Sequence, residues 1–286
     1  MRMDDQRESD NVEDRRGGGG LPGPGGLGII ATLLALAAGH YLGIDPREVL
    51  GLLSQVQHEA AAPPASHKPP ADDAEARFVS KVLADTEDSW GEIFRRAGKE
   101  YQPPRLVLFS ARTPTACGTG STAMGPFYCP GDRKVYIDLE FYRELERRYR
   151  APGQFAQAYV IAHEVGHHVQ NLMGISAKVH QAEQRARSQA EANGYSVRLE
   201  LQADCFAGVW GYRAEHIGHR LEPGEVEQAL RAASAIGDDT LQKQARGYAV
   251  PDSFTHGSAE QRVRWFERGM QSGDPRQCNT FKSAEL

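Results

Sequence analysis

The sequence predicts an α+β domain that is mainly helical and contains a small β-sheet. Two short apolar runs, Leu106 to Phe109 and Val135 to Leu139, have the length and composition of strands. Most of the chain from Glu140 to Gln271 is helical in pattern. A few short strands followed by a long series of helices are typical of this fold class.

The first 71 of the 286 residues are expected to lie outside this domain. Residues 1–26 are polar and then rich in glycine, which predicts a disordered tail. Residues 27–44 carry no charged side chain and reach the lower length limit of a transmembrane helix. Residues 45–71 combine a short amphipathic segment with a linker rich in proline and alanine. The remaining residues, 72–286, are enough for one substantial core.

The apolar run at 27–44 is interpreted as a signal anchor, with a signal peptide or a buried core helix as the alternatives. A signal peptide fits less well, because the polar segment before the run is long and no small-residue cleavage site stands out. Arg15 and Arg16 precede the run and favour a cytoplasmic N-terminus. We therefore expect a single-pass membrane protein whose domain lies outside the cytoplasm.

The domain is expected to begin with a long helix, because apolar residues recur at helical spacing between Phe78 and Phe94. A later helix within residues 151–173 has few charges and is apolar on most sides, so it should be buried. Gly174 is its expected C-terminal stop. The sequence thus places one buried helix after the two strands.

That buried helix contains the pattern His163-Glu-Val-Gly-His167. Two histidines four residues apart lie on one helical face, so both imidazoles can reach one cation. Glu164 would lie beside a water bound there, as in the His-Glu-x-x-His pattern of zinc peptidases. The alternative is a solvated helix face, but buried histidines need partners, which favours a metal. His168 points about 100° away from His167 and is interpreted as a hydrogen-bonded packing residue.

A catalytic zinc needs three protein ligands and an open position. Glu200 and Asp204 lie four residues apart on one face of a later helix, flanked by small residues such as Ala203 and Ala207. Small side chains would let the two helices approach closely. We expect Glu200 to be the third ligand and Asp204 to accept a hydrogen bond from the outer ring nitrogen of a ligating histidine. An amphipathic helix with two exposed acids is the alternative.

Four cysteines allow three disulfide connectivities, and none of them forms the Cys-x-x-Cys pair of a zinc cluster. We prefer Cys117 with Cys129, which closes a local glycine-rich loop. Cys205 would then pair with Cys278 and hold the C-terminal tail against a helix. Four reduced, buried thiols in a cytosolic protein are the alternative.

His-Glu-x-x-His followed by Glu-x-x-x-Asp resembles the gluzincin metallopeptidases, the group that contains thermolysin. The closer resemblance is to the bacterial YpfJ-type neutral zinc metallopeptidases, which are membrane-anchored. Four stretches carry it: 118–130, 159–170, 200–208 and 254–265. The resemblance implies a zincin-like fold, one zinc ion, a peptide or protein substrate, and a place in the bacterial inner or cytoplasmic membrane.

The last stretch is also similar to a Thr-His element of the CAAX-prenyl endopeptidases and the HtpX peptidase, in which a histidine after the third ligand lies near the metal. The similarity implies that His256 stabilises the oxyanion, with Tyr248 as a weaker candidate. The run from Ser258 to Gln261 predicts a capping box, so His256 would lie in a loop just before a helix. A solvated loop histidine is the alternative.

The predicted function is zinc-dependent hydrolysis of peptide bonds, with Glu164 as the general base. The alternative is a non-catalytic, zinc-stabilised, membrane-anchored binding protein. Structural zinc sites are closed by four protein ligands and need no glutamate base, so an intact Glu164 favours catalysis.

Other features of the sequence are interpreted as having no catalytic role. The net charge of −5, with both signs mixed, argues against a nucleic-acid surface. His216 and His219 lack acidic residues at a useful spacing and are interpreted as helix surface. Asp238 and Asp239 are interpreted as a solvated turn.

Overall fold

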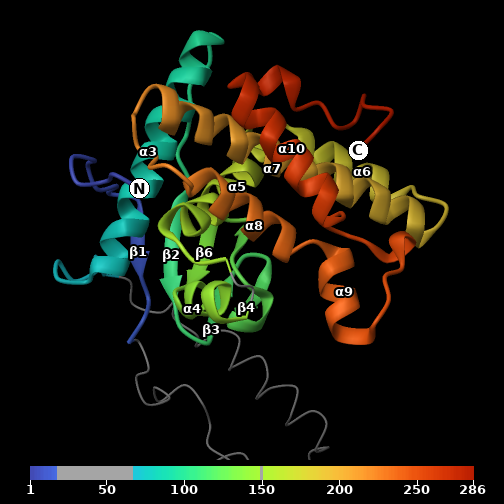
Figure 1. Cartoon of the computed structure of the whole chain (residues 1–286), viewed down its shortest axis with the longest axis horizontal. Coiled ribbons are helices and arrows are strands. Elements are labelled where there is room, and N and C mark those ends of the chain that lie inside the picture. The colour runs from blue at the N-terminus through green and yellow to red at the C-terminus, as the bar shows by residue number, and fades with distance from the viewer. Residues whose placement is uncertain (18–66, 149–150) are drawn as a thin grey trace, which may run out of the picture. The chain divides into compact units, whose positions relative to one another are not determined.

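The computed structural model describes residues 1–17, 67–148 and 151–286. Among them, Met1–Asp14 and Lys68–Leu286 form one compact unit (Figure 1). The strands are β1 (Val12–Asp14), β2 (Arg105–Phe109), β3 (Arg112–Thr115), β4 (Gly118–Ser121), β5 (Phe127–Cys129) and β6 (Lys134–Asp138). The helices are α3 (Ala74–Arg96), α4 (Glu140–Arg147), α5 (Gln154–Leu172), α6 (Ile175–Gln184), α7 (Gln189–His216), α8 (Glu225–Ala235), α9 (Asp238–Arg246) and α10 (Ala259–Ser272), with short 3-10 turns η1 (Thr122–Met124), η2 (Pro251–Ser253) and η3 (Pro275–Gln277).

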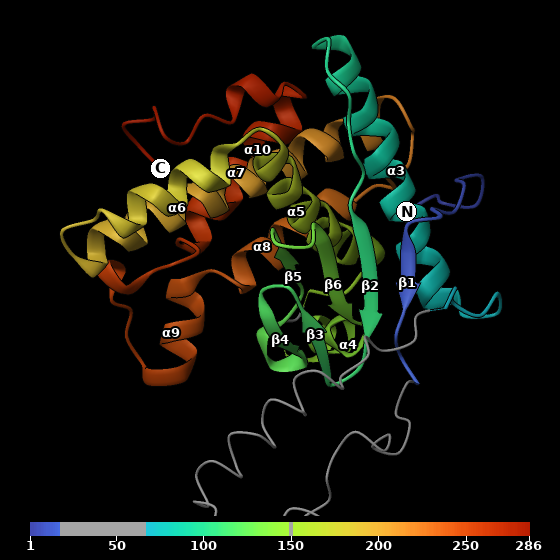
Figure 2. The same cartoon turned by 180° about the vertical axis from the view of Figure 1, so that it is seen from behind.

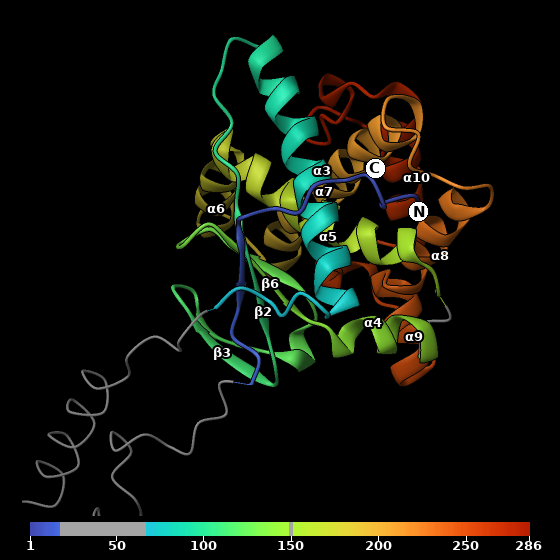
Figure 3. The same ribbon diagram turned by 90° about the vertical axis from the view of Figure 1, so that its left-hand side faces the viewer.

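The main sheet has four strands in the order β1-β2-β6-β5 (Figure 2). The first three are parallel and β5 is antiparallel to β6, while β3 and β4 form a separate hairpin. Side chains alternate between the two faces of the sheet. Leu106 and Leu108 join the large core under the helices, whereas Val107 and Phe109 join a small cluster on the other face. Figure 3 shows α3 and α5 together on the helix-covered side.

The predicted fold class is confirmed, because helices dominate the described residues and the sheet is small. The expected first helix is α3, the two expected strands are β2 and β6, and the expected buried helix is α5. Gly174 follows α5 in the left-handed conformation, as its role as a helix stop requires.

Helices α5 and α7 approach each other closely at Gly166. A Cβ atom on that glycine would lie 2.9 Å from the carbonyl oxygen of Ala203, which is closer than real side chains come. Helix α7 approaches α10 in the same way, because a Cβ on Gly208 would lie 2.1 Å from the carbonyl oxygen of Phe266. The small residues therefore bring three helix backbones together around one region of the core.

The prediction of a disordered tail is wrong for residues 1–14. Strand β1 pairs in parallel with β2, with Val12 opposite Leu106, and Met3 and Val12 are buried. Two polar residues of this segment have a buried partner, because Ser9 and Asn11 donate hydrogen bonds to the buried carboxylate of Glu87 on α3. From composition alone these two residues were expected to be solvated, but α3 supplies Glu87 as their hydrogen-bond partner. The domain therefore comprises residues 1–14 in addition to 68–286.

The predicted single-pass membrane topology with an extracytoplasmic domain is also wrong. Among residues 1–17, 67–148 and 151–286, no helix is both long enough and apolar enough to span a membrane. One crossing at 27–44 would put β1 and β2 on opposite sides of the membrane, yet these strands pair in one sheet. The run 27–44 itself and the segment 45–66 lie outside the described residues.

Both preferred disulfides are confirmed. Cys117 bonds to Cys129 beside the β3–β4 hairpin, and Cys205 of α7 bonds to Cys278 in the C-terminal segment. The second disulfide links the helix that carries Glu200 to a segment 73 residues later. It therefore holds that C-terminal segment against α7.

Candidate metal centre

Three side chains from two helices converge at one point of the core. His163 and His167 lie on α5, and Glu200 lies on α7. One ligand atom from each residue lies within 4.8 Å of the other two. The Nε2 atom of His163 is 3.2 Å from one carboxylate oxygen of Glu200, and Nε2 of His167 is 3.3 Å from the other. The residues predicted to be metal ligands are therefore close enough to hold one ion.

The outer ring nitrogens of both histidines have hydrogen-bond partners. Nδ1 of His163 lies 2.8 Å from Oδ1 of Asp204, and Nδ1 of His167 lies 2.9 Å from Oε1 of Gln170. Both partners are acceptors, so each Nδ1 donates its proton and Nε2 is the ring nitrogen left to bind a metal. Asp204 lies where the sequence analysis expected it, and this arrangement directs both Nε2 atoms toward Glu200.

Asp204 also binds two residues that the sequence analysis did not assign to the site. Arg262 of α10 contacts both of its carboxylate oxygens, through Nε at 2.9 Å and an outer nitrogen at 3.0 Å. The hydroxyl of Tyr159 donates to Oδ1 at 2.6 Å. Burial would raise the pKa of Asp204, but Arg262 and His163 outweigh it and lower that pKa to about 2. Asp204 therefore stays ionised beside the imidazole.

No spacing rule connects residues 159, 204 and 262, which is why sequence reasoning missed this group. Tyr159 lies one turn before His163 on α5, and Arg262 lies 58 residues after Asp204. Both residues fall inside the stretches that carry the family resemblance. Only the packing of α5, α7 and α10 brings their polar atoms together.

Glu164 is buried next to the first histidine. Its burial raises the pKa of the carboxyl group, although His163 and His167 partly oppose this. Within residues 1–17, 67–148 and 151–286, no hydrogen-bond donor to its carboxylate is found. A carboxylate of this kind accepts a proton more readily than an exposed one.

Comparison with known proteins supplies an independent observation. Residues 1–281 match the family described as “Putative neutral zinc metallopeptidase”. The chain belongs to this family.

Its relatives cover nearly the whole chain. The uncharacterized protein YpfJ of Escherichia coli strain K12 is 53% identical over 290 residues, which cover 98% of this chain and 99% of that protein. The uncharacterized protein Rv2575 of Mycobacterium tuberculosis strain H37Rv is 40% identical over 256 residues, covering 86% of this chain and 85% of that protein. No solved structure matches the chain.

The donor set fits the zinc ion that the family implies. Two imidazoles and one carboxylate are an established ligand set of catalytic zinc. Burial would lower the pKa of His163, but Asp204 and Glu200 outweigh it and raise that pKa to about 10. Burial would raise the pKa of Glu200, but the two imidazoles outweigh it and lower it well below its usual value. The cluster thus favours a positive charge between its donors, which a bound cation would supply.

The loop that contains His256 packs against α7. Gly257 has a φ of +96°, and a Cβ on it would lie 3.1 Å from Leu201, so this position requires glycine. The imidazole of His256 is 54% exposed and forms no hydrogen bond or ion pair with the three converging donors in the described residues. The hydrogen bond that His256 donates to the carboxylate of Asp238, assisted by the charge of Glu200, raises the pKa of His256.

The interpretation of Asp238 as part of a solvated turn is wrong. Its buried carboxylate accepts hydrogen bonds from the backbone N–H groups of Thr255, His256 and Gly257, at 2.6 to 3.1 Å. The predicted capping box between Ser258 and Gln261 is confirmed at the start of α10. Both ends of the loop are therefore held by rigid elements.

The remaining histidines and Tyr248 lie apart from the donors. His168 is buried, where its Nε2 donates to the carbonyl of Gln102 at 2.6 Å and its Nδ1 accepts from the hydroxyl of Tyr128. This confirms its interpretation as a packing residue. His216 and His219 are exposed, as expected. Tyr248 is 61% exposed.

Proposed function

We propose that this chain is a zinc-dependent endopeptidase in which one zinc ion is held by His163, His167 and Glu200. The observation that carries the proposal is the convergence of these three donors beside the buried carboxylate of Glu164. Membership of the zinc metallopeptidase family supports the choice of metal and of reaction.

In this proposal, Glu164 is the general base. When bound, zinc would supply Lewis-acid chemistry, because it lowers the pKa of water and polarises a carbonyl group. Glu164 accepts a proton from the attacking water while the water oxygen bonds to the carbonyl carbon. The carboxyl group then passes that proton to the amine nitrogen as the carbon–nitrogen bond breaks. The raised pKa of Glu164 suits a group that must accept a proton and later donate it.

The groups around the donors have two further roles. Asp204, kept ionised by Arg262, holds the Nδ1 proton of His163 and leaves Nε2 free for the metal. His256 donates to the oxyanion from the loop before α10. Its raised pKa keeps a larger share of the imidazole protonated, and a cation is a strong donor to a developing negative charge.

The second candidate function is a binding protein in which zinc only stabilises the fold. A closed structural site has four protein ligands. Among the described residues, three donors converge, and Glu164 is not one of them. This donor count favours an open position for water and therefore catalysis.

Replacing Glu164 with Gln separates the two functions. The Glu164→Gln variant should retain zinc by elemental analysis, because the donors are intact. Its cleavage of a mixed peptide library should fall by about 10² to 10⁴. Glu227→Gln on the exposed surface of α8 is the control and should cleave like the unchanged protein. Zinc binding without any cleavage by the unchanged protein would favour the binding protein, and normal cleavage by Glu164→Gln would exclude this general base.

A further inference from the structure

Gln170 is the residue that orients the second histidine. It lies on α5 less than one turn after His167 and is fully buried. Its amide nitrogen donates to the carbonyl oxygen of Leu199 at 2.6 Å and to Oε1 of Gln202 at 3.2 Å. Its amide oxygen therefore faces Nδ1 of His167, at 2.9 Å.

A second side-chain amide extends this series of hydrogen bonds to the C-terminal segment. Gln202 of α7 donates through its own nitrogen to the carbonyl oxygen of Cys278, at 2.8 Å. Its oxygen is then left to accept from Gln170. Cys278 is held in place by its disulfide with Cys205, one turn further along α7. A covalent link thus fixes the carbonyl at which the chain of amides ends.

The donor and acceptor roles in this series of hydrogen bonds are determined by the backbone carbonyls at which it ends. A backbone carbonyl can only accept, so the carbonyls of Cys278 and Leu199 require nitrogen from each glutamine. Each glutamine must then present its oxygen toward the metal site. His167 can only donate to that oxygen through Nδ1, so Nε2 is the ring nitrogen directed at Glu200 and the one left to bind a metal.

We propose that Gln170 and Gln202 are positioning residues that set the tautomer and the orientation of His167 for metal binding. The C-terminal segment belongs to the support of the site through the carbonyl of Cys278. This inference rests on the proposed zinc site. It differs from the support of His163, where the acceptor is a charged carboxylate rather than a neutral amide.

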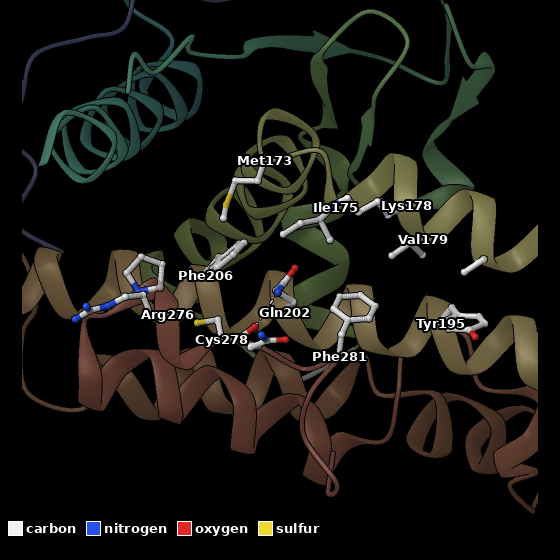
Figure 4. A pocket seen from close by; sticks show the side chains of 13 residues that line it. Met173, Ile175, Lys178, Val179, Tyr195, Gln202, Phe206, Arg276, Cys278 and Phe281 are labelled. Atoms are coloured by element: carbon white, nitrogen blue, oxygen red, sulfur yellow. Dashed lines mark hydrogen bonds between the residues drawn. The ribbon is translucent and has the colours of Figure 1, made fainter. Parts of the chain in front are cut away.

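Gln202 also borders a cavity that lies apart from the metal donors. The cavity has a volume of about 410 Å³, and none of His163, His167 and Glu200 lines it. Figure 4 shows Gln202 between Phe206 and Phe281 in this cavity. Water in the cavity can replace a hydrogen bond that is lost when Gln202 is substituted, whereas no water can reach the fully buried Gln170. The effect of substitution should therefore be larger at Gln170 than at Gln202.

The test measures zinc affinity of the full chain by competition with a chromophoric chelator. Gln170→Leu should weaken zinc binding by about 10- to 100-fold, and Gln202→Leu should weaken it less. Gln157→Leu, on the same helix but outside this series of amide hydrogen bonds, should bind zinc like the unchanged protein. Gln170→Met keeps the length of the side chain but offers no acceptor to His167, so it should lose about as much affinity as Gln170→Leu, which a mere packing role would not explain.

A second measurement separates positioning from folding. In the zinc-loaded protein, NMR should show a slowly exchanging Nδ1 proton on His167, and in Gln202→Leu this proton should exchange faster. Equal zinc affinity in Gln170→Leu and the unchanged protein, or a zinc-loaded protein in which Nδ1 rather than Nε2 of His167 binds the metal, would overturn the inference. Failure of the unchanged protein to bind zinc at all would instead overturn the proposed function.

Discussion

At the scale of single residues, Asp204 joins three other side chains in the metal centre. It is fully buried and binds His163, Tyr159 and Arg262 at once. A buried carboxylate with a bidentate guanidinium partner is stable only while both charges are present. The stability of the fold and the orientation of His163 therefore depend on the same ion pair.

We expect Arg262→Met to destabilise the metal-free protein by about 3 to 5 kcal/mol, because it leaves the carboxylate of Asp204 without its main counter-charge. Chemical denaturation measures this loss. Arg264→Met, on the exposed side of the same helix, should change stability by less than about 1 kcal/mol. Comparable losses of stability in the two variants would show that the buried ion pair contributes no more to stability than an exposed one.

His168 should make the stability of the fold depend on pH. Burial lowers its pKa from 6.5 to about 4, so the unfolded chain binds a proton on this residue at a higher pH than the folded chain does. The stability that neutral His168 contributes is fully present above pH 6.5 and is lost as the pH falls toward 4. The loss from this residue is roughly 3 kcal/mol. Denaturation curves of His168→Gln should lack this part of the pH dependence, and an identical slope in both proteins would contradict it.

At the scale of elements, the loop between η2 and α10 is held at both ends. Asp238 at the start of α9 binds three successive backbone N–H groups, and the capping box closes the start of α10. The loop can therefore hold His256 at a fixed place beside α7, where within the described residues it forms no hydrogen bond or ion pair with the metal donors.

If His256 stabilises the oxyanion, His256→Ala should lower kcat and kcat/KM together, by about 10² to 10³, and leave zinc content unchanged. Steady-state kinetics with one cleaved peptide and elemental analysis check both parts. His219→Ala, at an exposed histidine away from this loop, is the control. Loss of zinc in His256→Ala would make His256 a ligand instead, and normal turnover would remove its role.

At the scale of the whole molecule, the N-terminal strand closes one edge of the sheet. Strand β1 covers β2, and its segment satisfies the buried carboxylate of Glu87 on α3. The first 14 residues are therefore part of the fold that supports the metal site.

Val12→Asp should destabilise the domain by more than about 2 kcal/mol, because it places a charge at a buried position of β1. Thermal unfolding and limited proteolysis measure the effect. Asp10→Asn changes an exposed residue of the same segment and should be nearly neutral. Unchanged protease resistance in Val12→Asp would mean that β1 contributes little to the fold.

The sequence by itself determined the features that depend on local spacing. A helix places residues i and i+4 on one face, so the relation of His163 to His167 and that of Glu200 to Asp204 follow from the pattern alone. Two short apolar runs located β2 and β6. The scarcity of charges in α5 showed that this helix is buried. Local geometry has few solutions, which is why these predictions succeed.

Only the tertiary structure decided which distant residues meet. The contacts of Arg262 with Asp204, of Gln202 with Gln170, and of β1 with β2 join segments that no periodicity relates. In each case a polar group that looks solvated in the sequence finds a buried partner on another element. The same reason explains the failure of the disordered-tail prediction, since composition counts polar residues but not the partners that packing brings to them.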